Sequence, residues 1–439
     1  MHKLSNSTTE TVAVILAAGM GTRMKSSKPK AMHPIAGLPM IRLLLNQVEK
    51  VFDRIIVVLG PHMETLADLV KPHQVVIQKH RLGTAHAALQ AEAYFGKGIV
   101  TVLNADNPLI RENTLQRLID EKKKPKTDLV LLAMECNDPK AYGRVIENNG
   151  HVIKIVETLD ASDAEKKIKL CNSGVICADA LYFSKWLKEI ENHNAKKEYY
   201  IIDIVSLAVR EHKVVKALRA SETELTGINS QSELAFAESI IQKRLRKQAM
   251  DNGVTMISPE TVFMSYDTKI ENDVILHPNI VFGKNVVIRS GVEIKSFSHL
   301  EGCEIKQNAI IGPYARIRPD TVVGQDAHVG NFVELKATAL GDGVKANHLS
   351  YLGDSIVGKK TNIGAGTITC NYDGSRKHKT VIGDEVFVGS DAILVAPVEI
   401  GNKSLIAAGS VITDDVPDNA KAFGRARQVN KNSKVTLKN

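Results

Sequence analysis

A glycine-rich segment near the N-terminus combines a flexible backbone with positive charge. It reads Leu16-Ala17-Ala18-Gly19-Met20-Gly21-Thr22-Arg23-Met24 and is followed by Lys28-Pro29-Lys30. Its glycines let backbone N–H groups approach phosphate oxygens, and Arg23 and Lys30 supply charge. The segment lacks the Gly-Lys-Ser/Thr of a Walker loop and the third glycine of a dinucleotide-binding fingerprint. A glycine-rich loop alone can be only a turn, so the Lys-Pro-Lys that follows is the more specific part of the pattern.

A carboxylate lies at the end of an apolar run further along the chain. Asp106 belongs to Asn104-Ala105-Asp106-Asn107-Pro108-Leu109 and follows the apolar residues 99–103. Open α/β sheets bind their ligands just beyond the ends of such strands. A carboxylate there can hold Mg²⁺ against a triphosphate. The alternative is that Asp106 only caps a helix N-terminus.

A second group of polar residues lies in the other half of the chain. It contains Arg318, Lys336 and Asn347-His348-Leu349-Ser350-Tyr351, and it precedes a polar segment from Thr367 to Thr380. The cations suit a phosphate, and a histidine can take a proton from an amine. A single histidine is more often structural than catalytic, so both roles stay open for His348. The histidines at 277, 299, 328, 348 and 378 share no spacing that would indicate a metal site.

The first half of the chain alternates strand and helix patterns. Apolar strands are predicted at residues 12–17, 54–59, 75–77, 99–103 and 129–134, with helices at 40–50, 64–70, 84–93 and 112–121. This alternation predicts a parallel sheet with helices on both faces. Asn148-Asn149-Gly150 predicts a hairpin turn. Residues 230–250 have helical spacing before Asn252-Gly253, so we expect a Rossmann-like domain at 1–228 and a linker helix at 229–252.

The second half of the chain has a period of six. An aliphatic or aromatic residue returns every sixth position, with three one-residue slips, from Phe282 to Ile412, and glycine often follows it. This period fits neither a helix nor an alternating strand and is typical of a parallel β-helix. We therefore expect a left-handed parallel β-helix of hexapeptide repeats at 253–439, with the glycines supporting tight corners. A polar loop ejected between residues 367 and 380 is a common position for function.

Composition narrows the class of protein. The net charge is +8, but the basic residues are scattered and aromatic residues make up only 5% of the chain, so anionic small substrates fit better than nucleic acid. We expect the run from Lys122 to Lys126 to be a solvated loop. The five cysteines form no CxxC pair and predict reduced thiols in a cytoplasmic protein. No apolar run is long enough to predict a membrane span.

The N-terminal motif resembles that of the sugar-phosphate nucleotidyltransferases, Leu-x-x-Gly-x-Gly-x-Arg-Met followed by Pro-Lys. The resemblance implies that UTP and its sugar product bind Leu16, Ala17, Gly19, Arg23, Lys30, Gln78, Gly83, Thr84, Gly143, Glu157, Asn172 and Asn229. Within this set the segment from Gln78 to Ala87 would read the uracil edge, although His86 can be merely a residue at a helix start. Asp106 and Asn229 would hold Mg²⁺. Many such enzymes have Gly-Asp where this chain has Ala105-Asp106.

Residues 12–428 as a whole resemble the bifunctional bacterial N-acetylglucosamine-1-phosphate uridylyltransferase/glucosamine-1-phosphate N-acetyltransferase family. The most specific pieces are His348 with Tyr351, and Asn362-Ile363-Gly364-Ala365-Gly366-Thr367 leading to Asn371-Tyr372-Asp373-Gly374. The resemblance implies His348 as the general base and a homotrimer with sites between neighbouring solenoids. It implies that glucosamine 1-phosphate binds Arg318, Lys336, Tyr351, Asn362 and Lys377, and that acetyl-CoA binds Ala365, Asn371, Tyr372, Ser390, Ala408 and Arg425. The product, UDP-N-acetylglucosamine, would supply peptidoglycan and other envelope sugars.

Two other functions are compatible with this domain plan. The solenoid can be a purely oligomeric or regulatory module of a single-activity nucleotidyltransferase, against which His348 and the Asn371 loop argue. The chain can also be a non-enzymatic scaffold, like some subunits of translation-initiation exchange factors. Lys30, Asp106 and Asn229 together argue against that second alternative.

Overall fold

The computed structural model of the chain describes residues 9–432. They divide into two compact units, and the division falls between Ile241 and Gln242, inside helix α9 (Gln231–Asp251). A helix is therefore present where the linker is predicted, and the domain limits around it stay a prediction.

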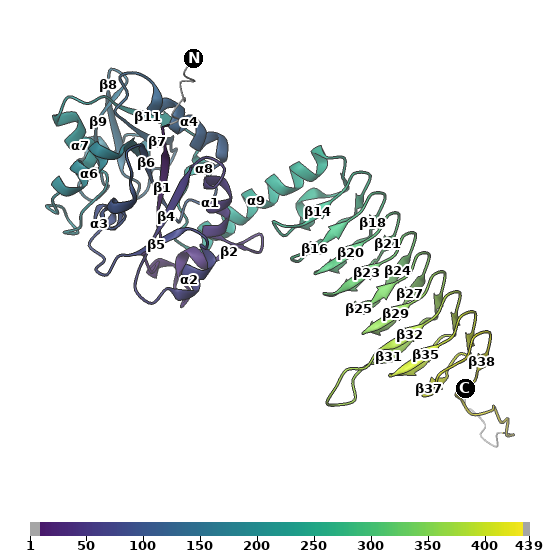
Figure 1. Ribbon diagram of the computed structural model, residues 1–439. Helices are drawn as coiled ribbons and strands as arrows, with labels where there is room; N and C mark the ends of the chain where they lie inside the picture. Colours follow the sequence, from purple (N-terminus) through teal and green to yellow (C-terminus); the bar gives the residue numbers. More distant parts are fainter. Residues whose placement is uncertain (1–8, 433–439) are drawn as a thin grey trace, which may run out of the picture. The chain divides into compact units, whose positions relative to one another are not determined.

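Unit 1 is built on one twisted sheet (Figure 1). Its strand order is β11 (Val215–Arg219), β7 (Leu129–Glu135), β10 (Leu170–Asp179), β6 (Ile99–Asn104), β1 (Thr11–Leu16), β4 (Arg54–Leu59) and β5 (Gln74–Ile77). The five strands predicted for this half of the chain are confirmed. The prediction of an all-parallel sheet is wrong, because β10 runs antiparallel to β6 and β7.

The antiparallel strand β10 follows the predicted hairpin in the chain. The predicted hairpin is confirmed as β8 (Arg144–Asn148) and β9 (His151–Val156), with Asn149 and Gly150 both at positive φ in its turn. Residues 157–169, which include the one-turn helix α5 (Asp163–Lys166), connect β9 to β10. β10 pairs antiparallel with β8 of this hairpin as well as with β6 and β7.

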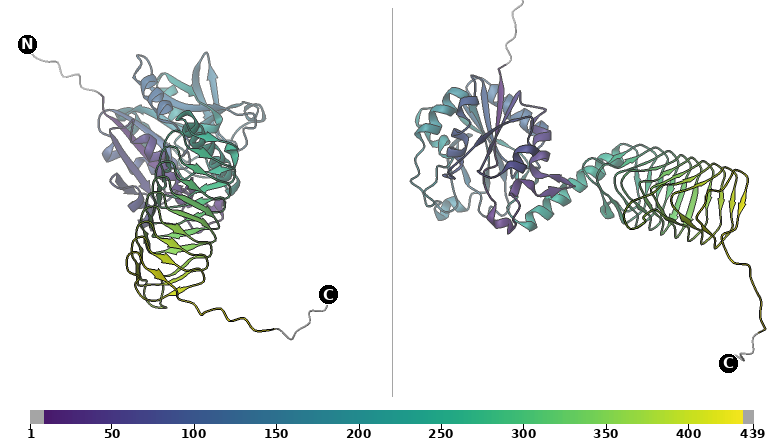
Figure 2. Two further views of the ribbon diagram at one scale, coloured as in Figure 1. Left: turned by 90° about the vertical axis from the view of Figure 1, so that its right-hand side faces the viewer. Right: turned by 60° about the horizontal axis from the view of Figure 1, so that its bottom comes forward.

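Helices cover both faces of this sheet, as the alternation predicts (Figure 2). One face packs against α3 (Thr84–Leu89), α6 (Ala180–Glu189) and α7 (Asp203–Arg210); the other packs against α1 (Met40–Val48), α2 (Glu64–Leu69), α4 (Glu112–Lys123) and α8 (Glu222–Leu225). The predicted solvated loop is confirmed for the exposed residues 124–126 and is wrong for Lys122 and Lys123, which lie in α4. Lys122 lies in α4, is buried, and its Nζ is 2.9 Å from Asp179 Oδ2, because a buried ammonium needs an ionic partner.

Unit 2 is a left-handed parallel β-helix with three walls of short strands (Figures 1 and 2). The first wall contains β12 (Thr255–Met256), β15 (Ile275–Leu276), β18 (Glu293–Ile294), β21 (Ile310–Ile311), β24 (His328–Asn331), β27 (Lys345–His348), β30 (Asn362–Ile363), β33 (Phe387–Val388), β36 (Leu405–Ile406) and β38 (Lys421–Ala422). The second contains β13 (Val262–Phe263), β16 (Ile280–Phe282), β19 (His299–Leu300), β22 (Arg316–Ile317), β25 (Glu334–Lys336), β28 (Tyr351–Gly353), β31 (Ile368–Cys370), β34 (Ile393–Val395) and β37 (Val411–Ile412). The third contains β14 (Lys269–Ile270), β17 (Val287–Ile288), β20 (Cys303–Ile305), β23 (Thr321–Val323), β26 (Ala339–Leu340), β29 (Ser355–Val357), β32 (Thr380–Ile382) and β35 (Val398–Ile400).

The six-residue period is confirmed, since the recurring residues from Phe282 to Ile412 form one buried core. The coils begin at β12, ahead of Phe282, from which the six-residue register is read in the sequence. The same spacing extends back through Leu276, Ile270 and Met264, which also face this core or lie within it.

Among the glycines that follow the recurring residue, Gly312 has a positive φ of +88° as expected of a tight corner, but most act differently from the prediction. Gly330 and Gly364 do not have positive φ; instead, a Cβ on Gly330 would lie 1.9 Å from Asn347 O and one on Gly364 would lie 2.5 Å from Ser390 N. They therefore permit close stacking of successive coils. Left-handed corners are taken by other glycines, such as Gly291 and Gly366, and by other residue types, among them Asn285, Asp326 and Phe332.

The ejected loop is shorter than predicted. Residues 368–370 form strand β31 and Thr369 continues the inward register, buried at 1% exposure. Because Thr369 is not aliphatic, the six-residue pattern of aliphatic residues does not show this coil in the sequence. Only the segment between Cys370 and Thr380 leaves the solenoid.

Candidate active sites

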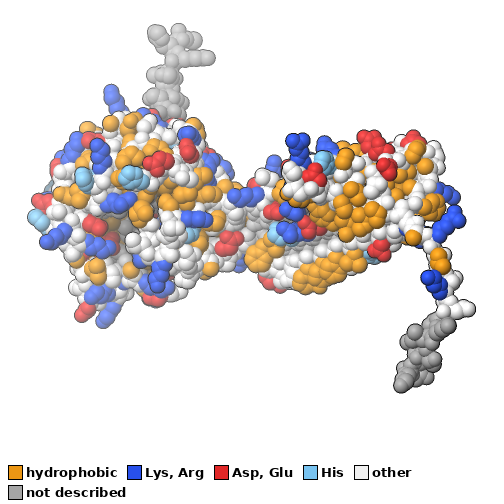
Figure 3. All heavy atoms as spheres, turned by 90° about the horizontal axis from the view of Figure 1, so that it is seen from below, with side chains coloured by type: hydrophobic (Ala, Val, Ile, Leu, Met, Phe, Trp, Pro, Cys, Tyr) orange, Lys and Arg blue, Asp and Glu red, His pale blue; other side chains and the backbone are white. Residues whose placement is uncertain are grey.

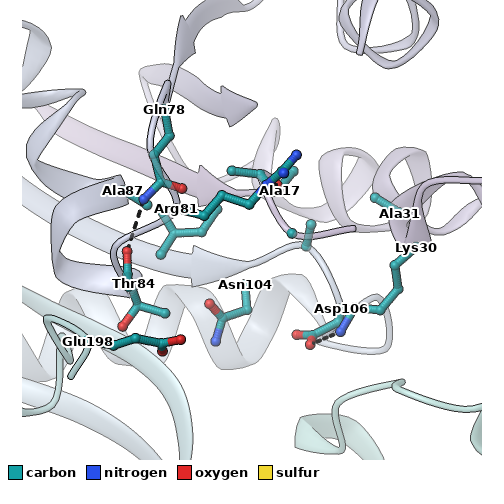
Figure 4. A pocket seen from close by; sticks show the side chains of 15 residues that line it. Ala17, Lys30, Ala31, Gln78, Arg81, Thr84, Ala87, Asn104, Asp106 and Glu198 are labelled. Carbon is teal, nitrogen blue, oxygen red and sulfur yellow. Dashed lines mark hydrogen bonds and ion pairs between the residues drawn. The ribbon is translucent and has the colours of Figure 1, made fainter. Parts of the chain in front are cut away.

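The first cavity of unit 1 lies at the carboxyl ends of β1 and β6 and has a volume of about 250 Å³ (Figure 4). Its lining includes these predicted residues: Leu16, Ala17, Gly19, Lys30, Gln78, Gly83, Thr84 and Asp106. Strand ends at a sheet edge are the expected location of a ligand in an open α/β fold.

The glycine-rich loop is folded onto Lys30. Gly21 has a φ of +67°, and a Cβ there would lie 2.6 Å from Lys30 Cβ. Only glycine combines this conformation with such a close approach. The loop consequently presents the Lys30 ammonium to the cavity (Figure 4).

Lys30, Asp106, Asn229 and Arg23 form one polar cluster. Lys30 Nζ lies 2.5 Å from Asp106 Oδ2 and donates to Asn229 Oδ1 at 2.9 Å. Arg23 also donates to Asn229 Oδ1, at 2.7 Å. The backbone N–H of Ile228 donates to Asp106 O at 2.9 Å, which brings Asn229 to the strand end. Asp106 is not a helix cap, since α4 begins only at Glu112.

The oxygen atoms of this cluster are suitable ligands for Mg²⁺. Asp106 and Asn229 direct two hard oxygens at one cation, here the Lys30 ammonium. Mg²⁺ is commonly held by one or two protein oxygens, with waters and substrate phosphates completing the shell. Among residues 9–432 no three histidine, cysteine or acidic side chains form a metal-binding group, so the protein's share of a site here is small.

The second cavity adjoins the first and has a volume of about 290 Å³. It is lined by the remaining predicted residues of unit 1, namely Arg23, Gly143, Glu157, Asn172 and Asn229. Asn104 and Asp106 line both cavities. Burial raises the pKa of Glu157 and that of Tyr142. Because Asn104 and Asp106 line both cavities, one long substrate can occupy both and extend across Asp106.

Sequence reasoning missed several residues that line these cavities. Arg81, Asn104 and Glu198 face the first (Figure 4), and Tyr142 and Glu233 face the second. Arg81 donates from Nε to Ala18 O at 2.8 Å, and Glu233 accepts from Asn229 N at 2.6 Å. Asn104 immediately before Ala105-Asp106 and Tyr142 immediately before Gly143 had a local signal in the sequence.

In unit 2 the stacking of coils aligns His348 with three of the six predicted acetyl-CoA residues. Ala346, Ile363, Val388 and Ile406 pair in successive coils. His348, Ala365, Ser390 and Ala408 each follow by two residues, so they form a column along one corner. His348 is exposed, and its Nδ1 lies 3.1 Å from Asn331 Oδ1. An amide oxygen only accepts, so Nδ1 carries the proton and Nε2 keeps its lone pair.

Two predicted cations, Arg318 and Lys336, follow the inward residues Ile317 and Leu335 of the second wall, and the third, Lys377, lies in the ejected loop. Arg318 pairs with Glu334 at 2.9 Å and Lys336 with Asp354 at 3.3 Å. The Lys336 ammonium lowers the pKa of Lys377. Neighbouring ammonium groups repel one another, and an anion between them relieves the repulsion.

The other predicted residues surround these two groups. Asn371 donates to the Asp354 carboxylate, and Asn362 pairs with Lys345 on the first wall. Tyr351 lies opposite Glu334 on the second wall. Tyr372 is 59% exposed in the ejected loop, and Arg425 is exposed just beyond Gly424, whose carbonyl accepts from Val411 N at 3.1 Å. The structure thus leaves Tyr372 and Arg425 open to solvent on this chain.

An open α/β sheet with ligand cavities at its strand ends and a left-handed β-helix with an exposed histidine together define a two-domain transferase. Residues 13–162 match the MobA-like NTP transferase domain, and residues 303–405 match the GMPPB C-terminal domain. The bifunctional protein GlmU of Gluconacetobacter diazotrophicus is 58% identical over 96% of this chain and 92% of its own length. GlmU of Gluconobacter oxydans is 54% identical over 97% and 95%, and GlmU of Bartonella quintana 46% over 96% and 95%.

The chain belongs to the bifunctional GlmU family. This confirms the enzyme class predicted from the sequence: acetyl transfer to glucosamine 1-phosphate and uridylyl transfer to N-acetylglucosamine 1-phosphate. Mg²⁺, UTP and acetyl-CoA are confirmed with it as cofactor and co-substrates. Within residues 9–432, no helix has the length and apolar character needed to cross a bilayer.

Proposed function

We propose that unit 1 carries out uridylyl transfer on the residues of the two adjoining cavities. UTP occupies the first cavity and the sugar phosphate the second. A phosphate oxygen of N-acetylglucosamine 1-phosphate attacks the α-phosphorus of UTP, and the bond to pyrophosphate breaks. The observation that supports this best is that Asp106 lines both cavities, where the reacting groups would meet.

The polar cluster supplies the charge for this step. Asp106 and Asn229 would hold Mg²⁺, which supplies Lewis-acid stabilisation of the phosphates when bound. Without substrate, Lys30 is bound to both oxygens. With UTP present, Lys30 and Arg23 are released to the phosphates and offset the charge on the leaving pyrophosphate.

Unit 2 carries out acetyl transfer at the corner column. Arg318, Lys336 and Lys377 hold the phosphate of glucosamine 1-phosphate, with Tyr351 and Asn362 beside its sugar. His348 Nε2 takes a proton from the amine, whose nitrogen then attacks the thioester carbonyl carbon. The carbon–sulfur bond breaks and the CoA sulfur takes up a proton. Asn331 keeps the His348 proton on Nδ1 throughout.

We also propose a homotrimer whose acetyltransferase sites lie between neighbouring solenoids. Phe297, Tyr314 and Phe332 stack ring on ring, with centroids 5.0 and 5.1 Å apart. Phe332 is 56% exposed, and Leu349, beside His348, is 61% exposed. Hydrophobic side chains gather in long patches on unit 2 (Figure 3). Exposed apolar surface of this kind supports self-association.

The location that we propose is the cytoplasm. All five cysteines are free thiols, which suits a reducing compartment.

The test is a substrate-omission assay read by mass spectrometry. With glucosamine 1-phosphate, acetyl-CoA, UTP and Mg²⁺, the expected product is UDP-N-acetylglucosamine. Without UTP the expected product is N-acetylglucosamine 1-phosphate, and without acetyl-CoA glucosamine 1-phosphate remains. UDP-glucosamine as the main product of the last mixture would contradict the order of the two steps.

A further inference from the structure

Gln78 presents only one end of its amide to the first cavity. The residue is 3% exposed. Its Nε2 donates to Gly83 O at 3.1 Å and lies 3.0 Å from Nδ1 of His86. Among residues 9–432, Oε1 has no hydrogen-bond partner, and it lies on the side of the amide away from the Gly83 bond (Figure 4). An acceptor is thus left for a ligand at the cavity.

The partners of the amide decide its orientation. A backbone carbonyl only accepts, so the amide nitrogen of Gln78, and not its oxygen, must face Gly83. The second N–H then meets His86, whose Nδ1 offers its lone pair at 3.0 Å, whereas the other ring nitrogen, Nε2, lies farther from its neighbour, 3.4 Å from Gln90 Nε2. Both hydrogens are consequently used, and Oε1 is held as a fixed acceptor.

Both anchors are themselves held in place. Gly83 has a φ of +117°, and a Cβ there would lie 2.5 Å from Tyr199 O. Tyr199 N donates to Leu82 O at 2.8 Å, and Ala85 N donates to Tyr199 O at 2.9 Å. His86 lies in helix α3. The two groups that orient Gln78, the Gly83 carbonyl and the His86 ring, therefore belong to a segment that is fixed by backbone hydrogen bonds to Tyr199.

We propose that His86 is a positioning residue for base selection, an inference that rests on the proposed UTP site. The fixed Oε1 accepts from the imide N3–H of uracil. Cytosine has an unprotonated N3, so it would place two lone pairs against each other. Without the His86 acceptor the amide is held by one bond only and can turn its N–H group to the base, which weakens the preference for uracil.

Two variants of similar size separate positioning from packing. His86→Asn places an acceptor near the position of Nδ1, whereas His86→Gln places its amide near the position of Nε2. The measured quantity is kcat/KM for UTP and for CTP, with N-acetylglucosamine 1-phosphate and Mg²⁺, on the full-length protein. We expect the UTP-to-CTP ratio to fall about 10- to 100-fold in His86→Gln and in His86→Ala, the effect of one oriented hydrogen bond. His86→Asn should keep the ratio within about threefold of the wild type.

The controls are the melting temperature and acetyl transfer, which should match the wild type in all three variants. An unchanged ratio in folded His86→Gln would overturn the inference, even if both nucleotides were used more slowly. If His86→Ala does not fold, the Asn and Gln variants decide. Absence of UTP turnover in the wild type would instead contradict the proposed function.

Discussion

The two active regions differ in how much of a site one chain encloses. In unit 1 the predicted residues line two cavities, with Gln78 at 3% exposure and Asn172 at 7%. In unit 2 the predicted residues lie on the outside of a solenoid, where His348 is exposed and Tyr372 is 59% exposed. A sheet edge makes a cleft by itself because its loops rise around the strand ends. A solenoid wall is flat, so a second surface is needed to enclose a substrate.

The largest effect should come from removing the base of the open site. His348→Ala should lower acetyl transfer by about 10²–10⁴-fold, the usual effect of losing such a group. Uridylyl transfer should not change, because the residues proposed for it all lie in unit 1. Both activities are measured on one preparation: release of the CoA thiol reports acetyl transfer, and release of pyrophosphate reports uridylyl transfer. Near-normal acetyl transfer in the folded variant would remove His348 from the mechanism.

The enclosed site of unit 1 should lose slightly less activity on substitution of its metal ligand than the open site loses in His348→Ala. Asp106→Asn should lower uridylyl transfer by about 10²–10³-fold, as loss of a single electrostatic stabiliser does. The carboxylate is a better Mg²⁺ ligand than an amide, so the Mg²⁺ concentration for half-maximal rate should rise. Acetyl transfer is the internal control. Unchanged Mg²⁺ dependence would place the metal elsewhere.

A substitution on the aromatic stack asks whether the open site needs a second chain. Phe332→Glu puts a charge on the exposed stack and should shift the proposed trimer toward monomer, by about 30-fold or more in association if Phe332 is a central contact. Acetyl transfer should fall with the trimer fraction at low protein concentration, whereas uridylyl transfer should not. Light scattering and both assays across a dilution series measure this. Full acetyl transfer by a monomer would show that one chain completes the site.

The smallest effect concerns the charge buried in the second cavity. Burial raises the pKa of Glu157, so its ionised form destabilises the folded chain above that pKa. The penalty is relieved as the pH falls through the folded-state pKa. Glu157→Gln should therefore raise the melting temperature at pH 7 and reduce the difference in melting temperature between pH 7 and pH 5. A variant less stable at pH 7 would mean that partners of Glu157 outweigh its burial.

The sequence predicted the repeating parts of the fold and missed those that depend on neighbouring coils or strands. The six-residue period reports an inward side chain in every strand, so it located the core from Phe282 onward. It could not show that Gly330 avoids the carbonyl of Asn347 in the next coil. The direction of β10 likewise depends on its pairing with β6 and β7.

The candidate sites show the same division. Asp106 and Lys30 stand in recognisable motifs, and their 2.5 Å contact follows from the loop and the strand end that carry them. Arg81 and Glu198 come from segments without a motif, and only the folded chain brings them to the cavity. His86 was predicted chiefly as a residue at a helix start; its contact with Gln78 joins positions on both sides of Gly83.

The most direct test of two independent sites in one chain is complementation between separately purified variants. Asp106→Asn and His348→Ala are each given glucosamine 1-phosphate, acetyl-CoA, UTP and Mg²⁺, alone and mixed, and the products are weighed. Asp106→Asn alone should accumulate N-acetylglucosamine 1-phosphate, and His348→Ala alone should leave glucosamine 1-phosphate. The mixture should restore UDP-N-acetylglucosamine to about half the wild-type rate or less, because the intermediate diffuses between proteins. A mixture that forms none, although each variant keeps its own remaining activity, would contradict the account.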